Sequence, residues 1–354
     1  MTTILTFACP VGVLQVSDRL TSVQSQKPDP KTGQPFTRTA YDTLANKALV
    51  HCASNAIVTI GHGGPAYLEK LPTDEWIAEK LWGKQLPRFI DGSPCLQVGR
   101  GRSAWPDIGY AVRTLKHELE RLPPSMPELS IVFAGWQKAR RSARPIMIHL
   151  ERKAKQRSVE LSESPRWWPR AQNVRYHEIG GYVSKDAATL LSQKMKAAAR
   201  GDFRAYEAAL ADTIRDISTR HPTSVGSNLL SITIPFYRYG IPCVRFLPTE
   251  DHKVAILNAA GEKTEVLTTY YSPWLIGPAM IYPPSFEVGD SFISIVAGTA
   301  KAQYAPFLFV ADMYWLQSLA GRRRSKVITT CPCLSNCARR RVSWGRSSNS
   351  FLRP

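Results

Sequence analysis

Apolar and polar residues alternate along the start of the chain, which predicts two short strands joined by a tight turn. The alternating runs are residues 2–9 and 13–18, with Pro10-Val11-Gly12 between them, and this layout is typical of a β-hairpin. Residues 22–40 are rich in Ser, Gln, Pro, Lys and Thr. We interpret this segment as an excursion from the core.

Helical periodicity occurs later in the chain, in two pairs of segments. Residues 73–82 begin with Thr73 as the expected capping residue and carry acidic residues in their first turn. Residues 105–122 repeat apolar side chains on one face. The second pair of predicted helices covers residues 185–199 and 203–220.

Strand patterns occur in groups between these helix pairs. The predicted strands after the hairpin are residues 47–52, 56–60, 129–136, 146–150, 156–162, 173–179, 228–234, 254–257 and 267–269. Grouped strands that alternate with paired helices differ from the strict alternation of a doubly wound parallel sheet. The order predicts an α+β layered sandwich, in which sheets pack on each other with helix pairs outside.

Bulk composition excludes several protein classes. The chain has 354 residues and is 44% hydrophobic, which suits a protein with a large packed core. No apolar run is long enough to span a bilayer, and the first residues lack the layout of a secretory signal. We therefore expect a cytoplasmic protein. The seven cysteines form an odd, scattered set, which argues against a disulfide framework.

The formal net charge of +18 is concentrated at the C-terminal end. Residues 321–354 carry nine Lys and Arg residues and no acidic residue, which predicts a solvated, disordered tail. Its cysteines, Cys331, Cys333 and Cys337, lack a fourth ligand for structural zinc. Nucleic-acid binding through this tail, by salt-dependent phosphate contacts, is a minor hypothesis.

The second residue of the chain can carry hydrolytic chemistry. Amide hydrolysis requires a nucleophile, a base that takes its proton, and donors for the developing oxyanion. A chain that begins with threonine supplies the first two from one residue, because its free α-amine lies within reach of its hydroxyl and has a near-neutral pKa. Thr2 meets this condition once Met1 is removed, so Thr2 is the candidate nucleophile.

Several residues after Thr2 follow a known spacing. Asp18 ends the hairpin, and Lys47 precedes the strand 56–60, which ends in the cluster Gly61-His62-Gly63-Gly64. This sequence resembles the proteasome β-subunits and their bacterial relatives, the N-terminal-nucleophile (Ntn) hydrolases. The resemblance covers about the first 250 residues. It implies a four-layer αββα sandwich over residues 1–270, followed by an extension of unknown role at 271–320.

The resemblance also implies roles for these residues. Lys47 would lower the pKa of the Thr2 hydroxyl and amine through its charge, and Asp18 would hold the lysine. A backbone N–H at a glycine would stabilise the oxyanion. A gap-free count from Lys47 selects Gly61, whereas the local glycine pattern selects Gly63 or Gly64.

Two segments depart from the family pattern. Gly180-Gly181-Tyr182 replaces an expected Gly-Ser-Gly, and Ser184 lies nearby but out of register. After the helix at 203–220, Ser224 fits the pattern, but His221 stands where the family has an aspartate. His221 could serve as a substitute base or could cap a loop.

The function implied by the resemblance is a threonine-type amidohydrolase, a proteasome-like peptidase that needs no metal or organic cofactor. Its expected partners are a peptide or other amide substrate and further copies of itself, and the resemblance allows an ATP-dependent unfoldase. The alternatives are a catalytically inactive structural or interaction subunit, a non-peptide amidase on the same fold, and a nucleic-acid-associated protein acting through the basic tail.

Overall fold

The alternating runs at the start of the chain form the predicted antiparallel hairpin. In the computed structural model, β1 (Ile4–Cys9) pairs with β2 (Gly12–Asp18), and every residue of both strands is buried. The hairpin lies in a five-stranded sheet of order β13-β1-β2-β14-β15. Its other strands are β13 (Arg175–Ile179), β14 (Leu229–Pro235) and β15 (Cys243–Leu247). β1 and β2 are therefore central strands.

The structure describes most of the first 288 residues. The described ranges are 2–9, 12–25, 37–42, 45–83, 97–98, 106–139, 142–163, 175–197, 202–236, 243–247, 253–257, 263–271, 273–277, 280–282, 284 and 286–288. Met1, the tail at 321–354 and the cysteines Cys331, Cys333 and Cys337 lie outside them.

A second sheet of eight strands has the order β12-β11-β10-β6-β5-β18-β19-β9. Its strands are β5 (Ala48–Ala53), β6 (Ala56–Gly63), β9 (Gln97–Val98), β10 (Leu129–Ala139), β11 (Ser142–Arg152), β12 (Val159–Glu163), β18 (Leu275–Ile276) and β19 (Met280–Tyr282). β18 pairs with β5 in parallel. Residues beyond 270 thus contribute to this sheet, and the domain boundaries at 270 and 320 stay predictions.

The remaining strands of the described residues form three small sheets. These sheets pair β3 (Thr21–Ser25) with β4 (Thr37–Asp42), β7 (Tyr67–Leu68) with β8 (Leu71–Pro72), and β16 (Lys253–Leu257) with β17 (Lys263–Tyr271) and β20 (Phe286–Val288). β3 and β4 fall in the segment that we interpreted as an excursion. They form an antiparallel pair separate from both large sheets, so the excursion itself contains a hairpin.

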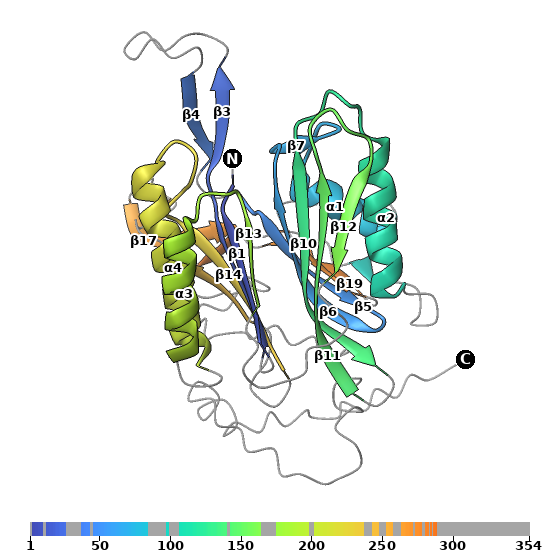
Figure 1. Cartoon of the computed structure of the whole chain (residues 1–354). Coiled ribbons are helices and arrows are strands. Elements are labelled where there is room, and N and C mark those ends of the chain that lie inside the picture. The colour runs from blue at the N-terminus through green and yellow to red at the C-terminus, as the bar shows by residue number, and fades with distance from the viewer. Residues whose placement is uncertain are drawn as a thin grey trace, which may run out of the picture. The chain divides into compact units, whose positions relative to one another are not determined.

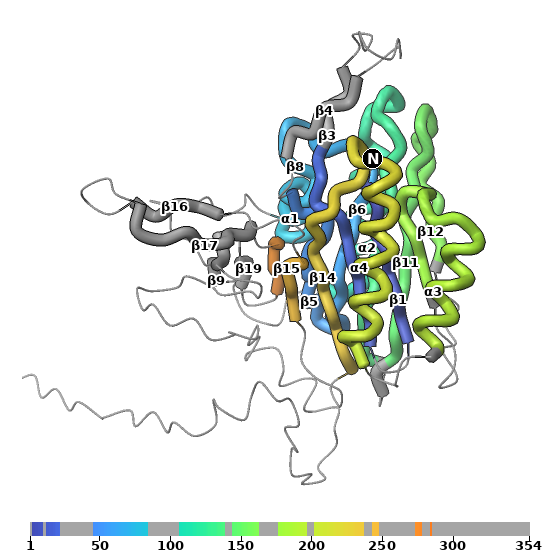
Figure 2. Tube along the Cα trace, turned by 90° about the vertical axis from the view of Figure 1, so that its left-hand side faces the viewer, coloured from blue at the N-terminus to red at the C-terminus, as the bar shows by residue number. Residues whose placement is uncertain are grey.

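The four helices within the described ranges pack in two pairs on the two large sheets (Figure 1). α1 (Thr73–Trp82) and α2 (Ile108–Arg121) share a hydrophobic cluster with the eight-stranded sheet. α3 (Lys185–Ala197) and α4 (Phe203–Arg220) share another with the five-stranded sheet. Figure 2 views the protein from the side of α3 and α4 and shows both running alongside β1 and β14.

Two further clusters join the two large sheets to each other. Ile4, Ala8 and Val13 contact Val132 and Ala134, and β14 and β15 contribute to a cluster with β5 and β6. The helices, strands and clusters confirm the mixed α+β class. The four-layer αββα order stays a prediction, which these clusters support.

The structure corrects two details of the predicted helices. Thr73 is not the capping residue of α1, because Pro72 precedes the helix and the Thr73 hydroxyl donates to the Pro65 carbonyl (2.7 Å). α2 begins at Ile108 rather than near residue 105, because the Asp107 carboxylate caps it by accepting from Tyr110 N–H (2.7 Å). No helix among the described residues is long and apolar enough to cross a bilayer.

A polar bridge crosses the interior between the large sheets. Gln15 on β2 is 1% exposed. Its Oε1 accepts from the Thr59 hydroxyl on β6 (2.7 Å), and its Nε2 donates to the Thr6 hydroxyl on β1 (3.0 Å). Because buried polar groups are costly without partners, this bridge fixes how β2 faces β6.

Replacing Thr59 tests the bridge. Thr59→Val keeps the shape of the side chain but leaves Gln15 Oε1 buried without its donor, so we expect a loss of about 1–3 kcal/mol in the free energy of unfolding. Urea denaturation measures this loss. Thr59→Ser, which retains the hydroxyl, is the control, and equal losses in both variants would show that the hydroxyl contributes nothing.

The buried imidazole of His51 predicts a pH dependence of stability. Burial lowers the pKa of His51 on β5 from 6.5 to about 4. As the pH falls from 7 to 4, the unfolded chain therefore takes up a proton that the folded chain does not, and the free energy of unfolding falls. This difference in pKa between the unfolded and the folded chain corresponds to a loss of about 3 kcal/mol.

Urea denaturation at pH 7 and pH 4 of the wild type and His51→Leu measures this effect. We expect a smaller acid-induced loss in the variant. His117→Leu, on an exposed face of α2, is the control and should keep the wild-type difference. An unchanged pH dependence in His51→Leu would contradict the prediction.

Candidate functional site

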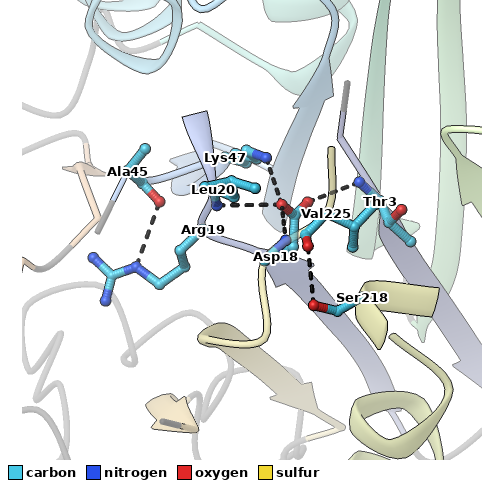
Figure 3. A network of polar contacts seen from close by, with 9 residues as sticks. Thr3, Asp18, Arg19, Leu20, Ala45, Lys47, Ser218 and Val225 are labelled. Atoms are coloured by element: carbon cyan, nitrogen blue, oxygen red, sulfur yellow. Dashed lines mark hydrogen bonds and ion pairs between the residues drawn. The ribbon is translucent and has the colours of Figure 1, made fainter. Parts of the chain in front are cut away.

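The buried carboxylate of Asp18 lies at the centre of the candidate site (Figure 3). It is fully buried at the end of β2. Asp18 Oδ1 accepts from Thr3 N–H (2.8 Å), and Oδ2 accepts from Lys47 Nζ (2.7 Å), Gly226 N–H (3.1 Å) and Leu20 N–H (3.2 Å). These four donors offset the loss of water around the charge.

Lys47 forms a buried ion pair with this carboxylate. The side chain of Lys47 is 6% exposed and that of Asp18 is 0% exposed. Lys47 lies one residue before β5, and its carbonyl accepts from His62 N–H on β6 (2.9 Å). The structure thus brings together the aspartate and the lysine that the sequence singled out.

Thr2 lies two residues before the start of β1, next to two glycines. A Cβ built on Gly63 would lie 3.6 Å from Thr2 Cβ and would overlap with Ile179. A Cβ built on Gly180, whose φ is +124°, would overlap with the Thr2 carbonyl oxygen. Thr2 is 7% exposed, and the close approach of both backbones requires residues without side chains.

The structure also separates the glycines of the cluster. A Cβ on Gly61 would lie 2.8 Å from Gln15 Nε2, so this residue faces the bridge between the sheets. A Cβ on Gly64 would lie 2.5 Å from the Glu128 carbonyl oxygen. Of the three glycines, Gly63 is the one whose nearest atoms include Thr2.

The segment after α4 reaches the site through its backbone. The Gly226 N–H donates to the Asp18 carboxylate, and the Ser218 hydroxyl donates to the Val225 carbonyl (3.0 Å). His221 is exposed and its ring lies 4.9 Å from that of Tyr182. Ser224 is half-buried in the same turn, where its N–H donates to the His221 carbonyl (3.0 Å).

The segment around residue 182 has a structural explanation. Glu178 Oε1 accepts from Tyr182 N–H (2.6 Å) and Val183 N–H (2.9 Å). Ser184 caps α3, because its hydroxyl accepts from Ala187 N–H (3.1 Å). Ser184 therefore serves the helix and does not replace the serine that the family pattern expects.

Two buried residues beside Lys47 were not identified from the sequence. Arg19 is fully buried and contacts Ala45 and Asn46, directly before the lysine. His62 is 6% exposed, and burial, followed by the charge of Lys47, lowers its pKa to about 3. Its place inside the glycine cluster was the available signal.

Among the described residues, no group of three or more His, Cys, Asp or Glu side chains could hold a metal ion.

Comparisons with known proteins give matches among solved structures alone. No family model matches the chain, and no curated protein matches it. An Anbu (Gly-1) mutant from Hyphomicrobium sp. strain MC1 is 12% identical with a TM-score of 0.45, covering 71% of this chain and 89% of that one.

Two further solved structures match at a similar level. Anbu (ancestral beta-subunit) from Yersinia bercovieri is 13% identical with a TM-score of 0.40, covering 66% of this chain and 81% of that one. The helical assembly of the Anbu complex from Pseudomonas aeruginosa is 10% identical with a TM-score of 0.40, covering 71% and 88%. At these TM-scores, none of the likenesses decides the family or the activity of this chain.

These findings correct the family assignment made from the sequence. The chain was identified with the proteasome β-subunit-like Ntn hydrolases, but it matches no family model, and the three solved structures described above are Anbu proteins of low identity. The assignment is wrong because it rested on a few residues that local structure also demands. Asp18 satisfies backbone donors, and Gly63 permits a close approach.

Removing the lysine tests the burial of the ion pair. Lys47→Met leaves the Asp18 carboxylate buried without its cation, so we expect a loss of about 3–5 kcal/mol in the free energy of unfolding. Urea denaturation measures it. Lys116→Met, which removes a half-exposed ion pair with Glu120 on α2, should cost at most about 0.5 kcal/mol. Equal losses would contradict a buried pair.

Proposed function

We propose that the chain is a threonine-type amidohydrolase, a peptidase that uses Thr2 as an N-terminal nucleophile after removal of Met1. The observation that carries this proposal is the Asp18 carboxylate, which binds both the backbone of Thr3 and the ammonium group of Lys47. A single buried anion thereby ties the start of the chain to a buried cation. Catalytic sites often bring buried charged groups together in this way.

The proposed reaction begins with attack of Thr2 Oγ on the carbonyl carbon of the amide. The α-amine of Thr2 takes the hydroxyl proton and then delivers it to the departing amine nitrogen, which breaks the C–N bond. An ester joins the acyl group to Thr2. Water, deprotonated by the same amine, attacks this ester, and the acid and the free Thr2 hydroxyl are released. Lys47 favours the neutral amine through its positive charge, while Asp18 holds Lys47 in place.

The third requirement, a donor that stabilises the oxyanion, falls to the glycine cluster at residues 61–64. We assign the oxyanion site to the backbone at Gly63, because of the three glycines of the cluster it is the one that lies against Thr2. A substrate carbonyl bound to Thr2 Oγ would share this space. Gly61, which faces Gln15, is better explained by the packing between the sheets.

The wider setting of the reaction belongs to the same proposal. The clusters that join helices to sheets and sheet to sheet support a four-layer αββα arrangement. A cytoplasmic location, assembly of several copies and an ATP-dependent unfoldase partner stay predictions. The proposed residues require no metal or organic cofactor.

One observation favours a second candidate, a catalytically inactive structural or interaction subunit. His221 is exposed and packs against Tyr182, so the residue that stands where the family has an aspartate lies in another environment. Retention of Met1 distinguishes this candidate, because a blocked amine cannot act as the base. The intact mass of the native protein reports it directly.

Replacing Thr2 tests the proposed nucleophile. We expect Thr2→Ala to lower kcat/KM for peptide-amide hydrolysis by more than about 10³-fold, because the attacking oxygen is lost. Thr2→Ser should retain measurable activity. Thr3→Val removes the neighbouring hydroxyl as a matched control and should keep most of the activity.

Fluorogenic peptide hydrolysis and intact mass provide the two measurements. We expect the intact mass of the active protein to be that of the chain without Met1. Equal activity in wild type and Thr2→Ala, or an active protein that retains Met1, would refute Thr2 as the nucleophile.

A further inference from the structure

The segment that carries Lys47 has no regular secondary structure. Ala45, Asn46 and Lys47 precede β5 and belong to no helix or strand. A lysine on such a segment has a long, flexible side chain, and ordering it costs conformational entropy. Other contacts must therefore hold the backbone from which Lys47 reaches Asp18.

Arg19 holds this segment from one side. Its Nε donates to the Ala45 carbonyl (3.4 Å), and its Nη2 donates to Asn46 Oδ1 (3.3 Å). In the opposite direction, Ala45 N–H donates to the Arg19 carbonyl (3.1 Å). The guanidinium lies 5.0 Å from the centre of the Phe246 ring on β15. The side chain of Arg19 is fully buried, and Figure 3 shows its contact with Ala45.

His62 holds the same segment from the other side. Its side chain forms a hydrogen bond with the backbone of Asn46, and its N–H donates to the Lys47 carbonyl (2.9 Å). Burial and the neighbouring Lys47 keep the imidazole neutral, with its pKa lowered to about 3. A neutral ring can donate to a carbonyl without placing a second positive charge beside the ammonium group.

We propose that Arg19 and His62 are positioning residues, which together hold residues 45–47 so that the Lys47 ammonium stays beside Asp18 and Thr2. This inference rests on the proposed function. Asp18 joins the Lys47 ammonium to the backbone N–H of Thr3, whereas Arg19 and His62 contact the backbone of residues 45–47. Loss of either contact releases Lys47 without removing any group of the proposed reaction.

The first measurement is the reactivity of the Lys47 amine, which does not depend on catalysis. Acetic anhydride is applied to the folded full chain, and mass spectrometry compares acetylation of Lys47 with that of the exposed Lys153. We expect Arg19→Gln and His62→Leu to raise the Lys47 rate, relative to Lys153, by at least about tenfold, because local opening exposes the amine. His62→Asn, whose amide nitrogen takes the place of Nδ1 and keeps a donor for the Asn46 backbone, should stay near the wild type.

The second measurement is the pH profile of peptide-amide hydrolysis. With Lys47 displaced, its charge no longer favours the neutral Thr2 amine, so the acid limb of kcat/KM should move to higher pH by about one unit or more. A merely structural role would lower activity without moving this limb. His62→Asn should keep the wild-type profile.

Arg152 provides a matched control. It is also a fully buried arginine, and it donates to the Pro123 carbonyl (2.7 Å) and the Leu122 carbonyl (3.3 Å), at the end of α2. Arg152→Gln should reduce stability but leave the relative Lys47 rate and the acid limb unchanged.

Three results would overturn the positioning role. They are an unchanged Lys47 rate in both Arg19→Gln and His62→Leu, an equal rise in Arg152→Gln, and an unmoved acid limb. A wild type without Thr2-dependent hydrolysis would instead refute the proposed function. The acetylation pattern would then decide by itself whether Arg19 and His62 hold Lys47.

Discussion

The buried charge of Asp18 is the constraint on which the rest of the site depends. A carboxylate without solvent is stable only when donors surround it. Its four donors come from separate parts of the chain, before β1, after β2, before β5 and after α4. The energetic requirement of one side chain therefore forces these four segments to converge, and the convergence places Thr2 and Lys47 in the same region.

Two glycines, which have no side chain, determine the space around Thr2. Gly63 and Gly180 let two backbones approach the start of β1 from the two large sheets. Added methyl groups would overlap with Ile179 and with the Thr2 carbonyl, respectively. The site thus combines an electrostatic anchor at Asp18 with a tightly defined backbone environment at the candidate nucleophile.

Sequence periodicity predicted the helices and strands whose own apolar spacing marks the face that is buried. The hairpin and the helix at 203–220 agree with the structure because their apolar spacing matches one buried face or a central strand. β18 was missed because its partner β5 lies far away in sequence. β15 was missed because it is a five-residue edge strand with partly exposed positions. Such short strands carry little periodic signal of their own.

The candidate site was predictable to a similar extent. The family resemblance that starts at Thr2 singled out Asp18 and Lys47, which the structure pairs. Arg19 was not predicted to belong to the site, because a charged residue after a strand is usually solvated. Its burial also depends on Phe246, which lies on β15, a strand that the sequence did not predict. The choice among the glycines also required coordinates, because it depends on which residue faces Thr2 and which faces Gln15.

The parallel pairing of β18 with β5 has a consequence for how the site is completed during folding. Val50 lies opposite Leu275, a separation of 225 residues. Until the later segment has been synthesised, the strand that leads out of Lys47 has one open edge, and closing so long a loop is slow. The lysine's strand is therefore among the last to gain its full set of neighbours, so the chain acquires an ordered cation beside Thr2 late in its folding.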